Sequence, residues 1–353
     1  MKNILQVCAY AAPYPGNFIN SLKKLADRNL KKGYNTIFAF PITAQKIDWC
    51  RDLEREYKIY YLPLNKARIY FKTYSVLKQI FQENDIEIAH SHFELYDIPT
   101  KVCAPKNTKV FWHLHDALDL IYSKSKIFHK LLWKAQYRYF GKKVKLLSVS
   151  EKGKKFAISL GFDKKNAFFV PNGIDTDRIR VRNISSKDID YLMFGWDYYR
   201  KGVDILESVL KNNFCERNFV VINSDEKKIE FSNGSKLNFE SPVSDVSQLY
   251  SNTKVFLHIS RQEGLSYALL EAIYSGCLVI CSDIDQNLFA KNIPTVHFVK
   301  VGDADDLYNK IKQIERGNIF VNQEKIFEAK SIIDKEYSLS SWINVMERYY
   351  FYE

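Results

Sequence analysis

Two glutamates around a glycine turn form the part of the sequence best suited to chemistry. Within Ser260–Ala272, Glu263 follows a strand-like apolar stretch, and Glu271 lies about two turns into the helical pattern that comes next. The first free N–H groups of that helix belong to Gly264, Leu265 and Ser266. Such groups bind phosphate or sugar oxygens, because the helix dipole and the unpaired donors both favour anions. Since carboxylates accept hydrogen bonds from hydroxyls, the segment indicates a site for a phosphorylated sugar.

Four of the seven histidines form a second group with chemical potential. They stand in two His-x-His pairs, His90 with His92 and His113 with His115, and alternate residues of a strand project to one face. Each pair could chelate a metal beside Asp116, which would suggest a metal-dependent hydrolase. The interpretation that we favour is a set of buried or substrate-facing histidines, because no further ligand pair follows and the second half of the chain would have no role.

Short apolar runs that alternate with helical patterns must position these residues, and this alternation is typical of parallel α/β sheets. In the first half the expected strands are Ile4–Cys8, Thr36–Phe40, Ile59–Leu62, Ile86–His90, Val110–Leu114 and Leu146–Val149. In the second half they are Tyr191–Phe194, Phe219–Ile222, Leu237–Phe239, Val255–Ile259, Leu278–Cys281 and Thr295–Phe298. We expect two doubly wound domains, at 1–169 and 170–333, with a ligand cleft at the carboxyl ends of their strands.

Size and composition agree with this organisation. A chain of 353 residues is too long for one ordinary core, and 46% hydrophobic with 26% charged residues excludes wholesale disorder or a fibrous repeat. Its cysteines lie mostly in apolar runs without paired metal spacing, as in reduced cytosolic proteins. They are Cys8, Cys50, Cys103, Cys215, Cys277 and Cys281. No run approaches the roughly 18 to 20 apolar residues that span a bilayer, and the N-terminus is interpreted as a strand.

Several segments, taken in order, resemble the group-1, or family 4, retaining glycosyltransferases of the GT-B fold. Glu263 and Glu271 form the Glu-x7-Glu pattern of that family. The other matching segments are Ala89–His92, Leu114–Asp116, Ser148–Ser150, Pro171–Asp175, Gly195–Gly202, Leu249–Tyr250, Ser275–Val279 and Tyr337–Tyr349. The resemblance runs almost end to end and implies two Rossmann-like domains, with a C-terminal helix at 334–353 that returns to the first.

The resemblance also implies a role for individual residues. Glu271 would bind the donor ribose, Glu263 the transferred sugar, and Lys201 the donor diphosphate, while His115 would lie at the edge of the reacting sugar. The full donor set would be Gly195, Arg200, Lys201, Glu263, Gly264, Leu265, Ser266 and Glu271, and the acceptor-side set Gly16, Asn17, His92 and Asp116. A nucleotide sugar would be the co-substrate, with no metal and no other cofactor.

Departures from the family pattern fall in the loops expected to bind the donor and the acceptor. Trp196 stands where the family usually has Arg, and we expect Arg200 to supply the second phosphate cation from the same loop. Gly16 is a single glycine where the family often shows a pair. Leu265 and Ser266 replace the commoner Phe and Gly.

The positive charge of +11 is concentrated in the first half of the chain. Residues 1–170 carry 30 Lys and Arg against 14 Asp and Glu, whereas residues 171–353 carry 22 against 27. In the helical pattern from Ser125 to Phe140 and just past it, basic residues recur every four positions at Lys126, Lys130, Lys134, Arg138 and Lys142. A second stretch carries Lys66, Arg68, Lys72 and Lys78. These segments favour either a helix lying on an anionic membrane or an ordinary domain helix with a solvated lysine face.

We therefore predict a retaining, metal-independent glycosyltransferase that acts on a lipid-linked or polysaccharide acceptor at the inner face of the cytoplasmic membrane. The alternatives are a metal-dependent hydrolase and a glycosyltransferase-like partner subunit that has lost turnover through the change at Trp196. No nucleic-acid reader motif is present, so nucleic acid is not expected as a partner. The donor sugar, the acceptor and the oligomeric state stay open at this level, because pocket shape sets the substrates.

Overall fold

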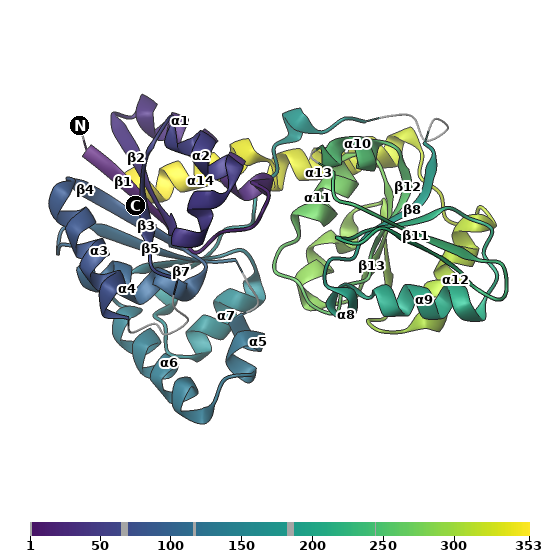
Figure 1. The fold of residues 1–353 in the computed structure, drawn as a ribbon, viewed down its shortest axis with the longest axis horizontal. Helices are drawn as coiled ribbons and strands as arrows, with labels where there is room; N and C mark the ends of the chain where they lie inside the picture. The colour runs from purple at the N-terminus through teal and green to yellow at the C-terminus, as the bar shows by residue number, and fades with distance from the viewer. Residues whose placement is uncertain (1, 65–69, 116–117, 182–186, 244) are drawn as a thin grey trace. The chain divides into compact units, whose positions relative to one another are not determined.

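The computed structural model describes residues 2–64, 70–115, 118–181, 187–243 and 245–353, whose path is shown in Figure 1. The chain divides into two compact units. The first unit comprises Met1–Asn172 with Trp342–Glu353, and the second comprises Gly173–Ser341. Each unit is built on one seven-stranded sheet with helices packed around it, so the predicted α/β class is confirmed.

The first sheet is parallel throughout, in the order β3-β2-β1-β4-β5-β6-β7. Its strands are β1 (Lys2–Cys8), β2 (Tyr34–Pro41), β3 (Lys58–Leu62), β4 (Ile86–His92), β5 (Lys109–Leu114), β6 (Lys145–Ser148) and β7 (Ala167–Phe169). Parallel strands are covered on both faces, which is why they read as unbroken apolar runs. β4 continues two residues past the predicted end at His90, so His92 also belongs to the strand. The sequence did not predict β7, because three residues are too few for a periodic signal.

The helices of the first unit connect these strands in βαβ units. They are α1 (Gly16–Lys31), α2 (Asp48–Glu54), α3 (Phe71–Glu83), α4 (Asp97–Cys103), α5 (Leu118–Ser123), α6 (Ile127–Phe140) and α7 (Glu151–Ser159). α1 shows how local sequence sets the fold, since its buried face includes Phe18, Leu22 and Leu25, as the helical spacing predicts. The chain turns after α1 at Gly33, whose φ of +85° lies in the left-handed region that favours glycine.

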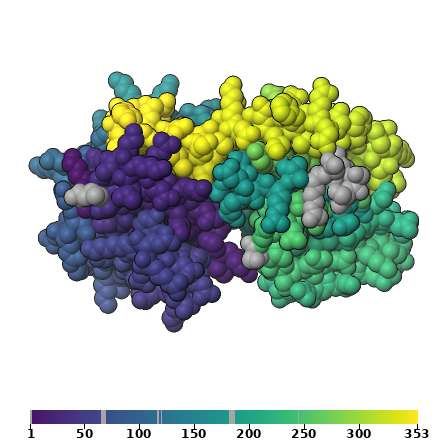
Figure 2. Space-filling model, turned by 90° about the horizontal axis from the view of Figure 1, so that it is seen from above, coloured from purple at the N-terminus to yellow at the C-terminus, as the bar shows by residue number. Residues whose placement is uncertain are grey.

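The last helix, α14 (Leu339–Phe351), joins the first unit from Trp342 onward, in agreement with the expected return of the C-terminus. Figure 2 shows its yellow atoms beside the purple N-terminal elements of that unit. Its buried side chains, spaced at three or four residues, are Trp342, Ile343, Met346, Tyr349 and Tyr350. Glu347 accepts from Arg28 of α1 at 3.0 Å and from Lys32, the residue after α1, at 2.6 Å. The apolar face and these two ion pairs together fix α14 on the first unit.

The second sheet has the order β10-β11-β9-β8-β12-β13-β14 and is parallel except for β10. Its strands are β8 (Ile189–Phe194), β9 (Phe219–Ile222), β10 (Lys227–Glu230), β11 (Lys236–Glu240), β12 (Thr253–His258), β13 (Leu278–Ser282) and β14 (Val296–Val299). The helices are α8 (Tyr198–Lys201), α9 (Val203–Asn212), α10 (Val246–Ser251), α11 (Tyr267–Tyr274), α12 (Ala304–Glu315) and α13 (Gln323–Glu336). Sequence patterns missed β10, because Lys227 to Glu230 form a largely exposed edge strand with one apolar side chain.

All six cysteines are free, and every one except Cys103 is buried. Cys277 donates to the carbonyl oxygen of Tyr250 at 3.3 Å and Cys281 lies within β13, so both serve packing, as expected. In the described part of the chain, every helix is too short or too polar to cross a bilayer.

Candidate functional site

The loop that follows β8 is shaped by two glycines. A Cβ atom at Gly195 would lie 2.4 Å from Cγ1 of Val221, on the neighbouring strand β9. Gly202 has a φ of +83°, and a Cβ there would lie 2.5 Å from the carbonyl oxygen of Ile259. A larger residue at either position would push the loop away from the sheet. Between the glycines, the single turn of α8 brings Lys201 into a buried position.

Lys201 forms an ion pair with Glu263, which lies in the loop after β12. The Nζ to Oε1 distance is 2.6 Å, and both side chains are buried. Burial alone would raise the pKa of Glu263, but the charges of Lys201 and His258, with hydrogen bonds from Lys201 and Ser260, together hold that pKa below its ordinary value. Burial lowers the pKa of Lys201, while Glu263 opposes that shift. Each charge is thus held in the interior by the other.

Arg200 adds a second cation to this carboxylate. Its Nη1 lies 3.6 Å from Oε2 of Glu263, and its Nε donates to Asp197 at 2.8 Å. Trp196, with 57% of its surface exposed, places its ring centroid 4.3 Å from Nζ of Lys201. The ring of Trp196 thus lies over the lysine, at the position where the family resemblance places an arginine. Arg200 therefore lies on the same loop and on the same carboxylate as Lys201, where the sequence predicted the replacement cation.

Arg261 holds this arrangement together and was not predicted from the sequence. It donates to both carboxylate oxygens of Asp204 at 2.7 Å, and its guanidinium carbon lies 3.9 Å from the ring centroid of Tyr199. Its backbone N–H donates to the carbonyl oxygen of Arg200 at 2.8 Å. These contacts fasten the loop of Glu263 to the loop of Lys201. The only signal in the sequence was an arginine just after a strand and two residues before Glu263. That signal does not show which residue the arginine contacts.

The second glutamate, Glu271, lies in the second turn of α11 and is buried. It is beside Tyr250, whose pKa is raised by burial and then by the negative charge of Glu271. Ser266 is the N-cap of α11 and accepts from the backbone N–H of Leu269 at 3.3 Å. Leu265 is buried and Gly264 is half-buried in the preceding turn. The strand, turn and helix around Glu263 and Glu271 thus have the predicted order.

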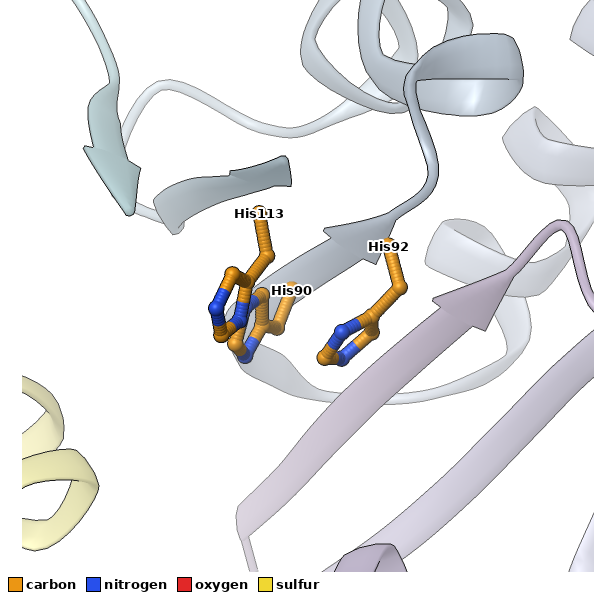
Figure 3. A group of neighbouring side chains, drawn as sticks. All are labelled: His90, His92 and His113. Carbon is orange, nitrogen blue, oxygen red and sulfur yellow. The ribbon is translucent and has the colours of Figure 1, made fainter. Parts of the chain in front are cut away.

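In the first unit, His90, His92 and His113 form the buried group shown in Figure 3. A ring nitrogen from each lies within 4.8 Å of the others. Hydrogen bonds engage both nitrogens of His92, with Gln6 at 2.9 Å and with His115 at 3.0 Å. The rings of His90 and His113 are stacked, with 4° between their planes. A metal could take His92 as a ligand only by breaking one of its two hydrogen bonds.

His115 is half-buried just beyond β5, and its Nε2 lies 3.0 Å from Nδ1 of His92. Burial lowers its pKa to about 3, although a hydrogen bond with Asn172 opposes that shift. The ring of Phe18 lies 5.2 Å from His92 and 5.3 Å from His115, between centroids. Phe18 follows Gly16, where φ is +54° and the residue is exposed, and Asn17, which is half-buried. The predicted acceptor-side residues Gly16, Asn17 and His92 therefore lie near His115 in the chain fold, whereas Asp116 lies outside the described residues.

Comparison with protein families matches both units. Residues 22–178 match the model described as Glycosyltransferase Family 4, and residues 190–316 match Glycosyl transferases group 1. The chain belongs to the family 4, or group 1, glycosyltransferases. It is therefore a transferase enzyme, and the function class predicted from the Glu-x7-Glu pattern is confirmed. A comparison with curated proteins gives no match.

Solved structures agree with this family in fold. Sucrose-phosphate synthase from Thermosynechococcus elongatus has a TM-score of 0.79 at 14% identity, over 99% of this chain and 98% of that one. HepE of Anabaena, solved with UDP, has a TM-score of 0.75 at 13% identity, over 99% of both chains. WaaG, described as a glycosyltransferase involved in lipopolysaccharide biosynthesis, has a TM-score of 0.71 at 14% identity over all of both. The glycosyltransferase thus has the GT-B fold.

These findings do not favour either alternative function. A metal-dependent hydrolase needs the histidine group as its centre, and the second unit would have no role in it. The family match instead gives both units a place in one transferase.

The predicted basic helix of the glycosyltransferase corresponds to α6, which contains Lys130, Lys134 and Arg138, whereas Lys126 is its N-cap and Lys142 lies in the turn after it. Residues four apart advance by about 40° around a helix, so these side chains shift progressively around α6. Lys130 is half-buried, with Nζ 5.6 Å from the ring centroid of Tyr122. Trp133 and Tyr137 are buried. Apolar side chains are exposed on other faces of α6, at 74% for Ile127, 70% for Phe128 and 60% for Leu131.

The second basic stretch is described only in part. Lys66 and Arg68 lie outside the described residues, while Lys72 and Lys78 are exposed on α3. Phe71, at the start of α3, has 84% of its surface exposed. Basic and apolar residues are thus exposed together on this helix as well.

The buried histidines predict a stability that falls as pH falls below about 6.5. Burial and the charges of neighbouring histidines hold the pKa of His90, His92 and His113 well below the ordinary value. The unfolded chain therefore gains protons that the folded chain does not bind, and each such histidine adds a slope of up to about 1.4 kcal/mol per pH unit. We expect His113→Phe to make the pH dependence of the urea unfolding free energy shallower by that amount between pH 7 and pH 5.

His129→Phe is the matched control, because it makes the same substitution at an exposed position on α6, outside the buried group. Parallel pH curves for His113→Phe and the unmodified enzyme would show that His113 titrates equally in both states, contrary to this account.

Proposed function

We propose that this glycosyltransferase moves a sugar, with retention and without a metal ion, from a nucleoside diphosphate to a lipid-linked or polysaccharide acceptor. The observation that carries the proposal is the cluster of Lys201 and Arg200 on Glu263, held on a glycine-shaped loop at the carboxyl end of β8. As the glycosidic bond breaks, negative charge grows on the leaving diphosphate. Two cations already fixed in place lower the energy of that state without reorganisation.

The ion pair also suggests how the donor enters the site. Without donor, Glu263 neutralises Lys201 at 2.6 Å. A diphosphate that shares the ammonium would leave Glu263 oxygens free to accept from hydroxyls of the transferred sugar, while Glu271 accepts from the ribose. HepE, a structural relative, was solved with UDP, which supports a uridine nucleotide as one candidate donor group.

His115 would act on the sugar as a neutral ring, because its pKa of about 3 keeps it uncharged at physiological pH. A neutral imidazole orients the sugar without opposing the positive charge that develops at its anomeric carbon. The resemblance to retaining enzymes favours attack by the acceptor on the face that the diphosphate leaves. In this scheme the leaving phosphate assists the acceptor, and no protein nucleophile takes part.

Donor binding gives a test of the two cations. We expect nucleoside diphosphates to raise the melting temperature, with about 2.7 kcal/mol of stabilisation at 100 times the dissociation constant. Lys201→Ala should weaken binding roughly ten- to a hundredfold, and Arg200→Ala roughly tenfold, because each removes a charged hydrogen-bond donor. A thermal-shift panel of diphosphates and nucleotide sugars measures both. Lys211→Ala, at an exposed lysine on α9, is the control. Unchanged affinity in Arg200→Ala would show that Arg200 does not replace the arginine that the family usually has at the position of Trp196.

Turnover gives a test of metal independence. We expect sugar transfer to persist in excess EDTA at its full rate, because Lys201 and Arg200 supply the positive charge that a metal would otherwise provide. Glu263→Ala should abolish transfer under the same conditions, which assigns the activity to this site. Loss of transfer in EDTA, with recovery on adding Mg²⁺ or Mn²⁺, would contradict the proposed mechanism.

The acceptor proposal rests on the surface of α6. Ile127, Phe128 and Leu131 expose apolar area, and five basic residues lie on this helix or directly beside its ends. Apolar side chains beside lysines suit the interface of an anionic membrane, where each Lys or Arg contributes about 1 kcal/mol. WaaG, which shares this fold, is described as acting in lipopolysaccharide biosynthesis. A lipid-linked acceptor at the inner face of the cytoplasmic membrane fits both observations.

Vesicle binding tests the role of α6. We expect the enzyme to sediment with phosphatidylglycerol vesicles and much less with phosphatidylcholine vesicles. Reversal of Lys126, Lys130 and Lys134 to Glu, or Phe128→Ser with Leu131→Ser, should each reduce binding at least tenfold. Reversal of the exposed Lys211, Lys228 and Lys236 makes the same charge change on the second unit and should have little effect. Absence of binding by the unmodified enzyme would refute the membrane proposal.

A further inference from the structure

A chain of buried side-chain hydrogen bonds connects His115 with the C-terminal helix inside the first unit. His115 Nε2 lies 3.0 Å from His92 Nδ1, and His92 Nε2 lies 2.9 Å from Oε1 of Gln6. Nε2 of Gln6 donates to the hydroxyl of Tyr350 at 3.0 Å, and that hydroxyl lies 2.6 Å from Nδ1 of His90. Gln6, His90 and His92 are fully or almost fully buried, as is Tyr350. The chain thus brings together β1, β4, the end of β5 and α14.

The amide of Gln6 gives this chain a single direction. Its Oε1 can only accept, so Nε2 of His92 must carry the proton and donate. A neutral His92 then has an unprotonated Nδ1, which accepts from Nε2–H of His115. On the other side, the Tyr350 hydroxyl accepts from the amide and donates its own proton to Nδ1 of His90. Each donor in the series therefore points the same way, from His115 to His90.

Neutral rings are required for this order, because an imidazolium donates from both nitrogens. Burial lowers the pKa of His92 well below its ordinary value, so its ring stays neutral at physiological pH. α14 is itself fixed beyond this contact, since Glu347 bridges to α1 and Lys109 donates to the backbone oxygen of Tyr350 at 3.2 Å. The position of the Tyr350 hydroxyl is therefore fixed, and its hydrogen bond orients the amide of Gln6.

We propose that Gln6 and Tyr350 are positioning residues that act through His92 to hold His115 as its Nε2–H tautomer. Nδ1 of His115 is then unprotonated, and it can accept from Asn172 or, in its place, from a hydroxyl of the sugar. His92, expected on the acceptor side, serves in this scheme as the link between the amide and His115. The tautomer assignment depends on the hydrogen-bond chain alone, whereas its effect on turnover rests on the proposed sugar transfer.

The tautomers can be read directly from enzyme labelled with ¹⁵N-histidine, because correlation spectra distinguish protonated from unprotonated ring nitrogens. At neutral pH we expect His92 and His115 each to show one tautomer, with the proton on Nε2. Gln6→Met removes the amide, and Tyr350→Phe removes only its hydroxyl partner. Both variants should give mixed tautomers at His92 and His115. Tyr349→Phe, which removes a hydroxyl from the neighbouring buried residue of α14, should leave the spectrum unchanged.

Kinetics separate this role from simple support of the fold. In Tyr350→Phe we expect kcat to fall roughly tenfold or more, as for a histidine held in the wrong tautomer, while KM for the donor stays constant. A proton on Nδ1 of His115 in the unmodified enzyme would overturn the proposal, as would unmixed tautomers in both Gln6→Met and Tyr350→Phe. If no nucleotide sugar is turned over, sugar transfer fails as the proposed function, and the spectra still decide the hydrogen-bond chain.

Discussion

The buried ion pair between Lys201 and Glu263 is the constraint on which the second unit depends. Two opposite charges in the interior are tolerated only while they stay in contact, and removing one partner of such a pair typically costs about 3 to 5 kcal/mol. The structure meets this condition through glycines at 195 and 202, where a Cβ would collide with Val221 of β9 or with the backbone of Ile259, and by fastening the two loops through Arg261. The result is a preformed pair of cations, held by carboxylates, in a half of the chain that is negative overall.

The first unit buries neutral polar side chains, whereas the second unit buries a pair of opposite charges. Its buried polar groups include His90, His92 and His113 with Gln6 and Tyr350, and burial holds the pKa values of these imidazoles and of the half-buried His115 low. Neutral donors and acceptors lose less on desolvation than ions do, and they can be ordered by hydrogen bonds alone. One unit thus offers fixed charge, as a diphosphate requires, and the other offers an oriented but uncharged ring, as a reacting sugar requires.

The excess of positive charge in residues 1–170 has a partial structural explanation. Helices α3 and α6 carry exposed lysines, and both also expose large apolar side chains such as Phe71 and Phe128. A purely solvated face would not need the apolar groups. Basic residues that repeat every four positions do not stay on one face of α6, since a helix has 3.6 residues per turn. The packing of Trp133 and Tyr137 determines which side chains of α6 are exposed and can contact a partner.

The sequence by itself determined the α/β class, most strands, the Glu-x7-Glu pattern and the family, because apolar periodicity and short motifs are local properties. It missed β7 and β10, which are too short or too exposed to give a pattern. Arg261, Gln6 and Tyr350 could not be predicted from it, since each contacts residues far along the chain; Gln6 and Tyr350 are 344 positions apart. Only the tertiary structure shows that both nitrogens of His92 are occupied. Hydrogen-bond partners are decided by which strands and helices become neighbours, and no local pattern encodes that.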